Sequence, residues 1–180
     1  PCTRPPTDPL RTRGSSGPFK LIAVDLDGTL LDSSGVPHEA DAKALSALAK
    51  SGKAHVTIAT GRLFSGTRAA ANISGILGPV ACADGSHIVH AESGTTLLHR
   101  GILGSAASCL SESLSRLELA TFLFAEDAIV FDDAGDHFVP YVKLWSDDVR
   151  RHSRVFDHDL WRSESGITAV VALGSEEQVA

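Results

Sequence analysis

An apolar run that ends in acidic residues constrains this chain more than any other feature. Residues 21–24 are all apolar, which is typical of a strand buried on both faces of a parallel sheet. Asp25, Asp27 and Gly28 follow within four positions. Because open α/β sheets bind ligands at the carboxyl ends of their strands, we expect both carboxylates to face a crevice there. Gly28 permits the turn that this requires.

Strand and helix patterns alternate after this run. We predict a helix from Pro37 to Gly52, a strand over 55–59, a helix opened by Thr60 to Arg62 and ended by Gly75, and a strand over 80–83. The packed helix faces are expected to be Ala40, Ala44, Ala47 and Leu48, then Leu63, Ala70 and Ile73. This alternation indicates an α/β fold, a parallel sheet with right-handed crossovers.

From residue 86 the pattern changes to that of a separate α+β unit. The predicted elements are a hairpin over 86–90 and 95–99, a helix over 106–117, strands over 121–125 and 128–131, a helix over 141–150 and a strand over 167–173. Ser175 to Gln178 is a capping-box sequence at the start of a last helix. We therefore expect a flexible tail at 1–18, a core at 19–85 and an incomplete second unit at 86–180.

Residues suited to phosphoryl chemistry cluster at the predicted sheet edge. A carboxylate can attack phosphorus if a cation offsets the repulsion and a second acid protonates the leaving oxygen, and Asp25 and Asp27 form such a pair. Gly28 and Thr29 add backbone donors. After the next strand, Thr60 offers a hydroxyl, Gly61 an N–H group and Arg62 a positive charge, all of which can bind phosphate.

These segments resemble known motifs. The sequence Asp-Leu-Asp-Gly-Thr-Leu-Leu at 25–31 is similar to motif I of the haloacid dehalogenase superfamily, and Ala-Thr-Gly-Arg at 59–62 is similar to its motif II. With Cys-Ala-Asp-Gly-Ser at 82–86, the chain resembles the Cof-type phosphatases of subclass IIB, which usually have Asn-Gly-Ala where Asp84 begins the triplet here.

The resemblance implies a Rossmann-like core with an inserted α+β cap and a Mg²⁺-dependent phosphomonoester hydrolase. It implies that Asp25 forms an aspartyl-phosphate and binds Mg²⁺. Asp27 would act as general acid and base and bind Mg²⁺ through its carbonyl oxygen. Thr60 would hold the phosphate, which agrees with the phosphate-binding groups that the residues themselves indicate at Gly28, Thr29, Gly61 and Arg62. The substrate class implied is a small phosphorylated metabolite such as a sugar phosphate.

The family's motif III lysine and motif IV acids have no counterpart in this sequence. We therefore expect the C-terminal part of the core to be missing, with the chain ending inside the cap, and the chain alone to be weak or inactive, since too few ligands would hold the metal. A non-catalytic binding or regulatory module and a phosphomutase or phosphotransferase remain as alternatives.

The composition indicates which classes of partner and which compartment the chain is suited to. The net charge is −6, with no basic run that would indicate nucleic acid or an anionic membrane as a partner. Three unpaired cysteines and the lack of a membrane-length apolar run favour a cytoplasmic protein. Cys82 and Cys109 are expected to be buried thiols. His87, His90 and His99 are interpreted as exposed strand residues in preference to a metal site.

Overall fold

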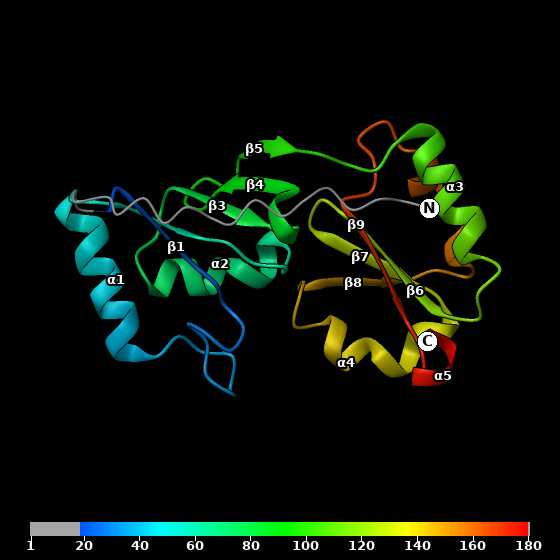
Figure 1. Ribbon diagram of the computed structural model, residues 1–180, viewed down its shortest axis with the longest axis horizontal. Coiled ribbons are helices and arrows are strands. Elements are labelled where there is room, and N and C mark those ends of the chain that lie inside the picture. Colours follow the sequence, from blue (N-terminus) through cyan, green and yellow to red (C-terminus); the bar gives the residue numbers. More distant parts are fainter. Residues whose placement is uncertain (1–18, 180) are drawn as a thin grey trace, which may run out of the picture.

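The computed structural model describes residues 19–179, so the tail expected at 1–18 lies outside the described residues. The chain has a mixed α/β fold with two units (Figure 1). One contains α1, α2 and the strands β1 to β5, and the other contains α3, α4, α5 and the strands β6 to β9. No helix in the described part of the chain is long and apolar enough to cross a bilayer.

The first unit begins with the predicted parallel arrangement. β1 (Leu21–Val24) and β2 (His55–Ile58) pair in parallel over their full lengths, and a parallel bridge from Ala59 to Ala81 places β3 (Pro79–Cys82) beside β2. α1 (Glu39–Ser51) and α2 (Phe64–Ile73) connect these strands. The strand–helix–strand alternation expected from the sequence is confirmed.

The burial of β1 differs from the prediction. The strand was expected to be buried on both faces, but Leu21 is 60% exposed and Ala23 is also exposed. β1 hydrogen-bonds to β2 alone among the described strands, so it lies at a sheet edge. An apolar run shows that a strand can be buried, but not which neighbours cover it.

The helices are where predicted, but their packed faces were partly wrong. In α1, Ala40, Ala44 and Ala47 are exposed, whereas Ala42 is buried and Leu45 packs on the core. Alanine is small enough for either face, so the larger Leu45 sets the helix orientation. In α2, Ala70 is buried as expected, but Ile73 is 54% exposed.

The hairpin extends the first unit. β4 (His87–His90) pairs antiparallel with β3, and β5 (Thr96–His99) pairs antiparallel with β4. Val89 of β4 belongs to the same buried cluster as Leu26. The domain boundary expected after residue 85 stays a prediction. The hairpin pairs directly with β3, the strand that precedes it.

The second unit is built on a four-stranded sheet in the order β8-β7-β6-β9. Its strands are β6 (Ala120–Ala125), β7 (Ala128–Phe131), β8 (Asp148–Arg151) and β9 (Ala169–Leu173). Its helices are α3 (Gly104–Leu114), α4 (Val139–Val142) and α5 (Glu176–Val179), with four short 3₁₀ turns elsewhere in the described chain. In the expected capping box, the Gln178 Oε1 accepts a hydrogen bond from the Ser175 N–H at 2.8 Å.

The helix expected over 141–150 is wrong. α4 ends at Val142, and residues 148–151 form β8, which pairs in parallel with β7. That pairing joins residues about twenty positions apart, so local periodicity could not reveal it.

The second unit is packed on both faces of its sheet. Apolar residues on one face gather beneath α3 and include Leu123, Val130 and Trp161. The other face carries Phe122, Phe124 and Ile129. Leu63 and Ala83 of the first unit belong to this second cluster, so the two units share a buried contact.

Candidate functional site

The segment after β1 folds around one buried side chain. Leu26 is fully buried, and its carbonyl oxygen accepts hydrogen bonds from the N–H groups of Thr29, Leu30 and Leu31 at 2.9 to 3.2 Å. This tight turn leaves Asp25 and Asp27 exposed on either side of Leu26.

Gly28 occupies the turn because of its backbone conformation. Its φ is +72°, a left-handed value that side-chain-bearing residues rarely adopt, and a Cβ atom there would meet no other atom within 4 Å. The expectation that Gly28 permits the turn is confirmed.

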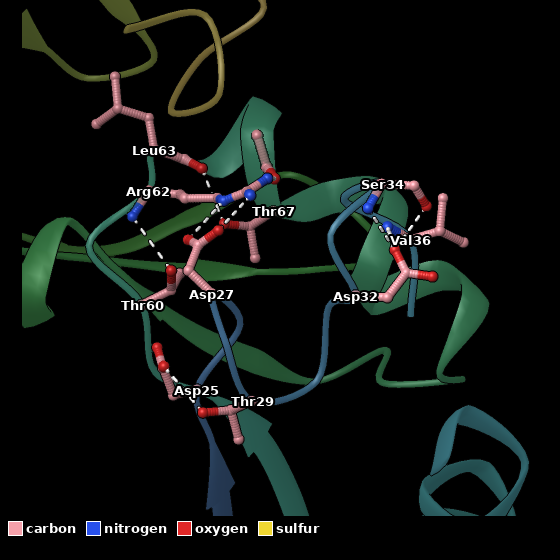
Figure 2. Close-up of polar contacts among 11 residues, drawn as sticks. Asp25, Asp27, Thr29, Asp32, Ser34, Val36, Thr60, Arg62, Leu63 and Thr67 are labelled. Carbon is pink, nitrogen blue, oxygen red and sulfur yellow. Dashed lines mark hydrogen bonds and ion pairs between the residues drawn. The ribbon is translucent and has the colours of Figure 1, made fainter. Parts of the chain in front are cut away.

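The loop from Thr60 to Arg62 lies beside this turn, as Figure 2 shows. The parallel register of β1 and β2 sends both strands toward the same edge, where the Ala59 N–H donates to the Val24 carbonyl at 3.0 Å. Thr60 is buried, and its Oγ1 accepts a hydrogen bond from the Arg62 N–H at 3.2 Å. The structure therefore brings the two predicted segments together.

Arg62 binds Asp27 directly. Its Nε and Nη2 donate to the two carboxylate oxygens of Asp27 at 2.8 and 2.5 Å, and its Nη1 donates to the Gly66 carbonyl at 3.3 Å (Figure 2). Arg62 is only 8% exposed, whereas the Asp27 side chain is half exposed. Hydrogen bonding from Arg62 holds the pKa of Asp27 below its ordinary value, against the opposing effect of partial burial.

Asp25 has a different environment. Within residues 19–179 its carboxylate accepts one side-chain hydrogen bond, from the Thr29 hydroxyl at 3.3 Å, and forms no ion pair. The surroundings of the two carboxylates thus differ sharply, because the Asp27 carboxylate is held by a cation and the Asp25 carboxylate is open to solvent. Such unequal environments give neighbouring acids different chemical roles.

Asp84 lies closer to this edge than the sequence indicated. A Cβ atom on Gly61 would come within 3.3 Å of the Asp84 Oδ1, so the carboxylate lies over Gly61. Ala83 and Asp84 both have positive φ values, 47° and 53°, a costly conformation for residues that carry side chains. The Asp84 N–H donates to the Thr60 carbonyl at 3.1 Å, which helps to hold it. The sequence signal for this proximity is the place of Asp84 directly after the strand predicted over 80–83, because parallel strands end at one edge of a sheet.

The side chains provide only part of a Mg²⁺ site. The Asp25 carboxylate and the Asp27 backbone carbonyl are oxygen ligands of the kind that Mg²⁺ prefers, but the Asp27 carboxylate is bound by Arg62. No group of three or more His, Cys, Asp or Glu side chains that could hold a metal occurs in the described residues. The Asp25 carboxylate and the Asp27 carbonyl could therefore fill fewer than half of the six coordination positions around an octahedral Mg²⁺ ion.

Two expectations about the remaining side chains need correction. His87 was interpreted as exposed, but it is 3% exposed, stacks edge-on against His99 and shares a hydrogen bond with the Thr96 hydroxyl. Cys82 is buried as expected, whereas Cys109 is exposed. Side-chain direction at these positions depends on the register of the hairpin and on the rotation of α3.

A contact between Asp127 and Ser65, close to the candidate site, was not predicted from the sequence. It lies in the turn between β6 and β7, and its Oδ1 accepts a hydrogen bond from the Ser65 N–H at 2.6 Å. The two residues are 62 positions apart, and no local pattern connects them.

The family comparison agrees with the motifs. The family model described as haloacid dehalogenase-like hydrolase matches residues 22–178. A comparison with curated proteins found no significant match.

Solved structures share the fold. A haloacid dehalogenase-like hydrolase from Bacteroides thetaiotaomicron superposes with a TM-score of 0.71 at 20% identity, over 90% of this chain and 60% of that one. A Thermotoga maritima protein gives 0.70 at 20% identity, over 89% and 58%. A subclass IIB sugar phosphatase gives 0.63 at 14% identity, over 89% and 60%. The chain thus spans about 60% of the length of these relatives. From the family model and the fold together, the chain belongs to the haloacid dehalogenase-like hydrolases.

Proposed function

We propose that this chain carries the nucleophile side of a phosphomonoester hydrolase that works through an aspartyl-phosphate on Asp25. The observation that carries this proposal is the contrast between an open Asp25 carboxylate and an Asp27 carboxylate held by Arg62. A nucleophile must be accessible, and the Asp25 carboxylate is open to solvent whereas the Asp27 carboxylate is held by Arg62.

In the first step of the proposed reaction, an Asp25 oxygen attacks phosphorus and the bond to the leaving alkoxide breaks. The leaving oxygen takes a proton from Asp27. In the second step, water attacks the phosphorus of the aspartyl-phosphate, Asp27 takes a proton from that water, and inorganic phosphate leaves. The Asp25 carboxylate is thereby restored.

The pairing with Arg62 favours one of the two roles of Asp27. Hydrogen bonding from Arg62 lowers the pKa of Asp27 and so favours its ionised form, which is the form that the second step needs. To act as an acid in the first step, Asp27 must leave the Arg62 guanidinium and take up a proton. Arg62 therefore disfavours the protonated form of Asp27 in this proposal, and Gly28, Thr29, Thr60 and Gly61 are the groups left to bind phosphate.

Mg²⁺ is the proposed cofactor. The Asp25 carboxylate and the Asp27 carbonyl oxygen would hold it, and the ion would offset the repulsion between the carboxylate and the phosphate when bound. Oxygen ligands beyond those of the described residues are needed to complete the octahedron.

The proposed substrate is a small phosphorylated metabolite, of which a sugar phosphate is one example. The support is the likeness of fold to a sugar phosphatase and the net charge of −6, which does not favour polyanionic partners.

The proposal is tested by measuring hydrolysis of p-nitrophenyl phosphate with and without Mg²⁺. Asp25→Asn should lower the rate by roughly a thousandfold or more, as loss of a covalent nucleophile does. Asp41→Asn, a matched change at an exposed acid of α1, should leave the rate unchanged. Equal Mg²⁺-dependent turnover by Asp25→Asn and by the unmodified chain would refute the assignment, whereas no turnover by either would favour the binding module described next.

A non-catalytic phosphate-binding module is the second candidate. The observation in its favour is that the described residues provide only part of the metal site. Calorimetry with inorganic phosphate, read together with the turnover assay, separates the two candidates, because a binding module retains phosphate affinity but shows no Mg²⁺-dependent turnover.

A further inference from the structure

The N-terminus of α2 lacks a cap of its own. Leu63 precedes the helix, and its apolar side chain cannot accept a hydrogen bond from the first N–H groups. Two acceptors come instead from the second unit, since the Leu63 N–H donates to the Trp145 carbonyl at 2.8 Å and the Ser65 N–H donates to the Asp127 Oδ1 at 2.6 Å.

Asp127 is itself held in place. Its carbonyl oxygen accepts a hydrogen bond from the Ser146 hydroxyl at 2.6 Å, and Ser146 is fully buried. The hydroxyls of Ser146 and Ser65 lie 3.1 Å apart, and the Asp147 N–H donates to the Ser65 hydroxyl at 3.1 Å. A small network therefore joins the first turn of α2 to two loops of the second unit.

The contact is close as well as polar. A Cβ atom at Gly66 would lie 2.8 Å from the Trp145 carbonyl oxygen, so the backbones of the two units touch at this point. Leu63 is fully buried in the apolar cluster of the second unit. The close approach is local to Gly66, since a pocket of about 280 Å³ lined by Ser65, Asp127 and Asp147 lies beside it.

This same turn holds the site arginine. Arg62 precedes Leu63 directly, and its guanidinium donates to the Gly66 carbonyl while it binds Asp27. The Thr67 hydroxyl donates to the Leu63 carbonyl at 2.9 Å, which ties the loop to the helix. Displacing the first turn of α2 would therefore displace Arg62.

We infer that Asp127 is a positioning residue, which completes the N-terminus of α2 from the second unit and thereby fixes Arg62 on Asp27. Docking of the second unit and the geometry of the loop at 60–62 are then one coupled arrangement. The consequence for phosphate chemistry rests on the proposed function, whereas the coupling itself does not.

The test compares backbone and side-chain hydrogen exchange by NMR, without substrate, in the unmodified chain and in Asp127→Ala. The Ser65 amide should exchange about tenfold faster in Asp127→Ala, the effect typical of losing a capping carboxylate. The Arg62 Nε–H should also exchange faster, a change that a purely local cap would not produce.

Asp147→Ala is the matched control. Asp147 is an exposed acid of the same contact, and its backbone, not its carboxylate, donates to Ser65. This variant removes the same charge and should leave both exchange rates unchanged. If Asp127→Ala and Asp147→Ala give the same Ser65 rate, or if the Arg62 rate does not respond, the inference is overturned.

Two further variants keep the test decisive if Asp127→Ala fails to fold. Asp127→Asn retains a neutral oxygen acceptor, so its Ser65 exchange should lie between the other two rates. Gly66→Ala should force the Trp145 backbone away, although alanine normally favours a helix. The Ser65 amide proton and the Arg62 Nε proton should then both exchange faster. Unchanged exchange in both would contradict the coupling. Because no turnover is measured, this result is independent of whether Asp25 is a nucleophile.

Discussion

The two units of this chain hold their functional and structural residues by different means. The second unit has apolar clusters on both faces of its sheet, and Phe122 at its centre is fully buried. In the first unit β1 lies at a sheet edge, and an apolar groove of about 730 Å³ lined by Val56 and Ile76 opens between α1 and the strands. The candidate site lies on the more open unit. Its geometry therefore depends on specific hydrogen bonds and on the neighbouring unit more than on depth of burial.

Truncating a central side chain of the second unit should have the largest effect. Phe122 stacks on Phe131 with 5.7 Å between ring centroids, and Phe122→Ala should lower the free energy of unfolding by about 3–5 kcal/mol. Leu21→Ala in the exposed part of β1 should change it by roughly 0.5 kcal/mol or less. Urea denaturation measures both. Equal losses would show that the first unit is packed as fully as the second.

The alkylation rates of Cys82 and Cys109 should distinguish a buried thiol from an exposed one, and this is the second comparison. Burial raises the pKa of Cys82 to about 11, from an ordinary value of 9.0, which leaves about a hundredfold less thiolate at pH 8. Cys109 on α3 is exposed and should be alkylated first. Peptide mass spectrometry after timed iodoacetamide treatment gives the two rates. Comparable rates would mean that β3 opens readily.

The Arg62–Asp27 pair should make a modest, pH-dependent contribution. Because the pKa of Asp27 is lowered by folding, the stabilisation is fully present above the unfolded pKa and is lost as pH falls through the folded one. Arg62→Gln should cost about 1 kcal/mol at neutral pH, since Asp27 is half exposed and water screens the pair. The cost should shrink in acid.

Unfolding curves from neutral to acid pH measure this dependence. Arg68→Gln serves as the control, because Arg68 is exposed and lies over the Phe64 ring with no carboxylate partner in the described chain. If the two variants have the same pH dependence, the Arg62–Asp27 pair does not stabilise the fold.

The sequence predicted much of the first unit because its elements are local. The apolar run at 21–24, the glycine that ends α1 and the alternation of the hairpin at 86–99 are all readable from neighbouring residues. The site segments were placed together correctly because parallel strands joined by crossovers end at one edge.

What the sequence did not reveal depends on contacts between distant residues. β8 forms only because β7 offers a sheet edge, and the capping of α2 by Asp127 spans 62 positions. The partner of Arg62 was also not predicted, because a guanidinium in a crevice can bind either a phosphate or a carboxylate. The structure selects Asp27 by placing its two oxygens opposite Nε and Nη2.

Identifying the phosphorylated residue tests the central proposal most directly. The chain is incubated with p-nitrophenyl phosphate and Mg²⁺ and quenched with borohydride, which reduces an aspartyl-phosphate to homoserine, and the peptides are sequenced by mass spectrometry. We predict homoserine at position 25 and none in Asp25→Asn. Homoserine at Asp27 or Asp84, or no conversion at position 25 while hydrolysis proceeds, would contradict the account.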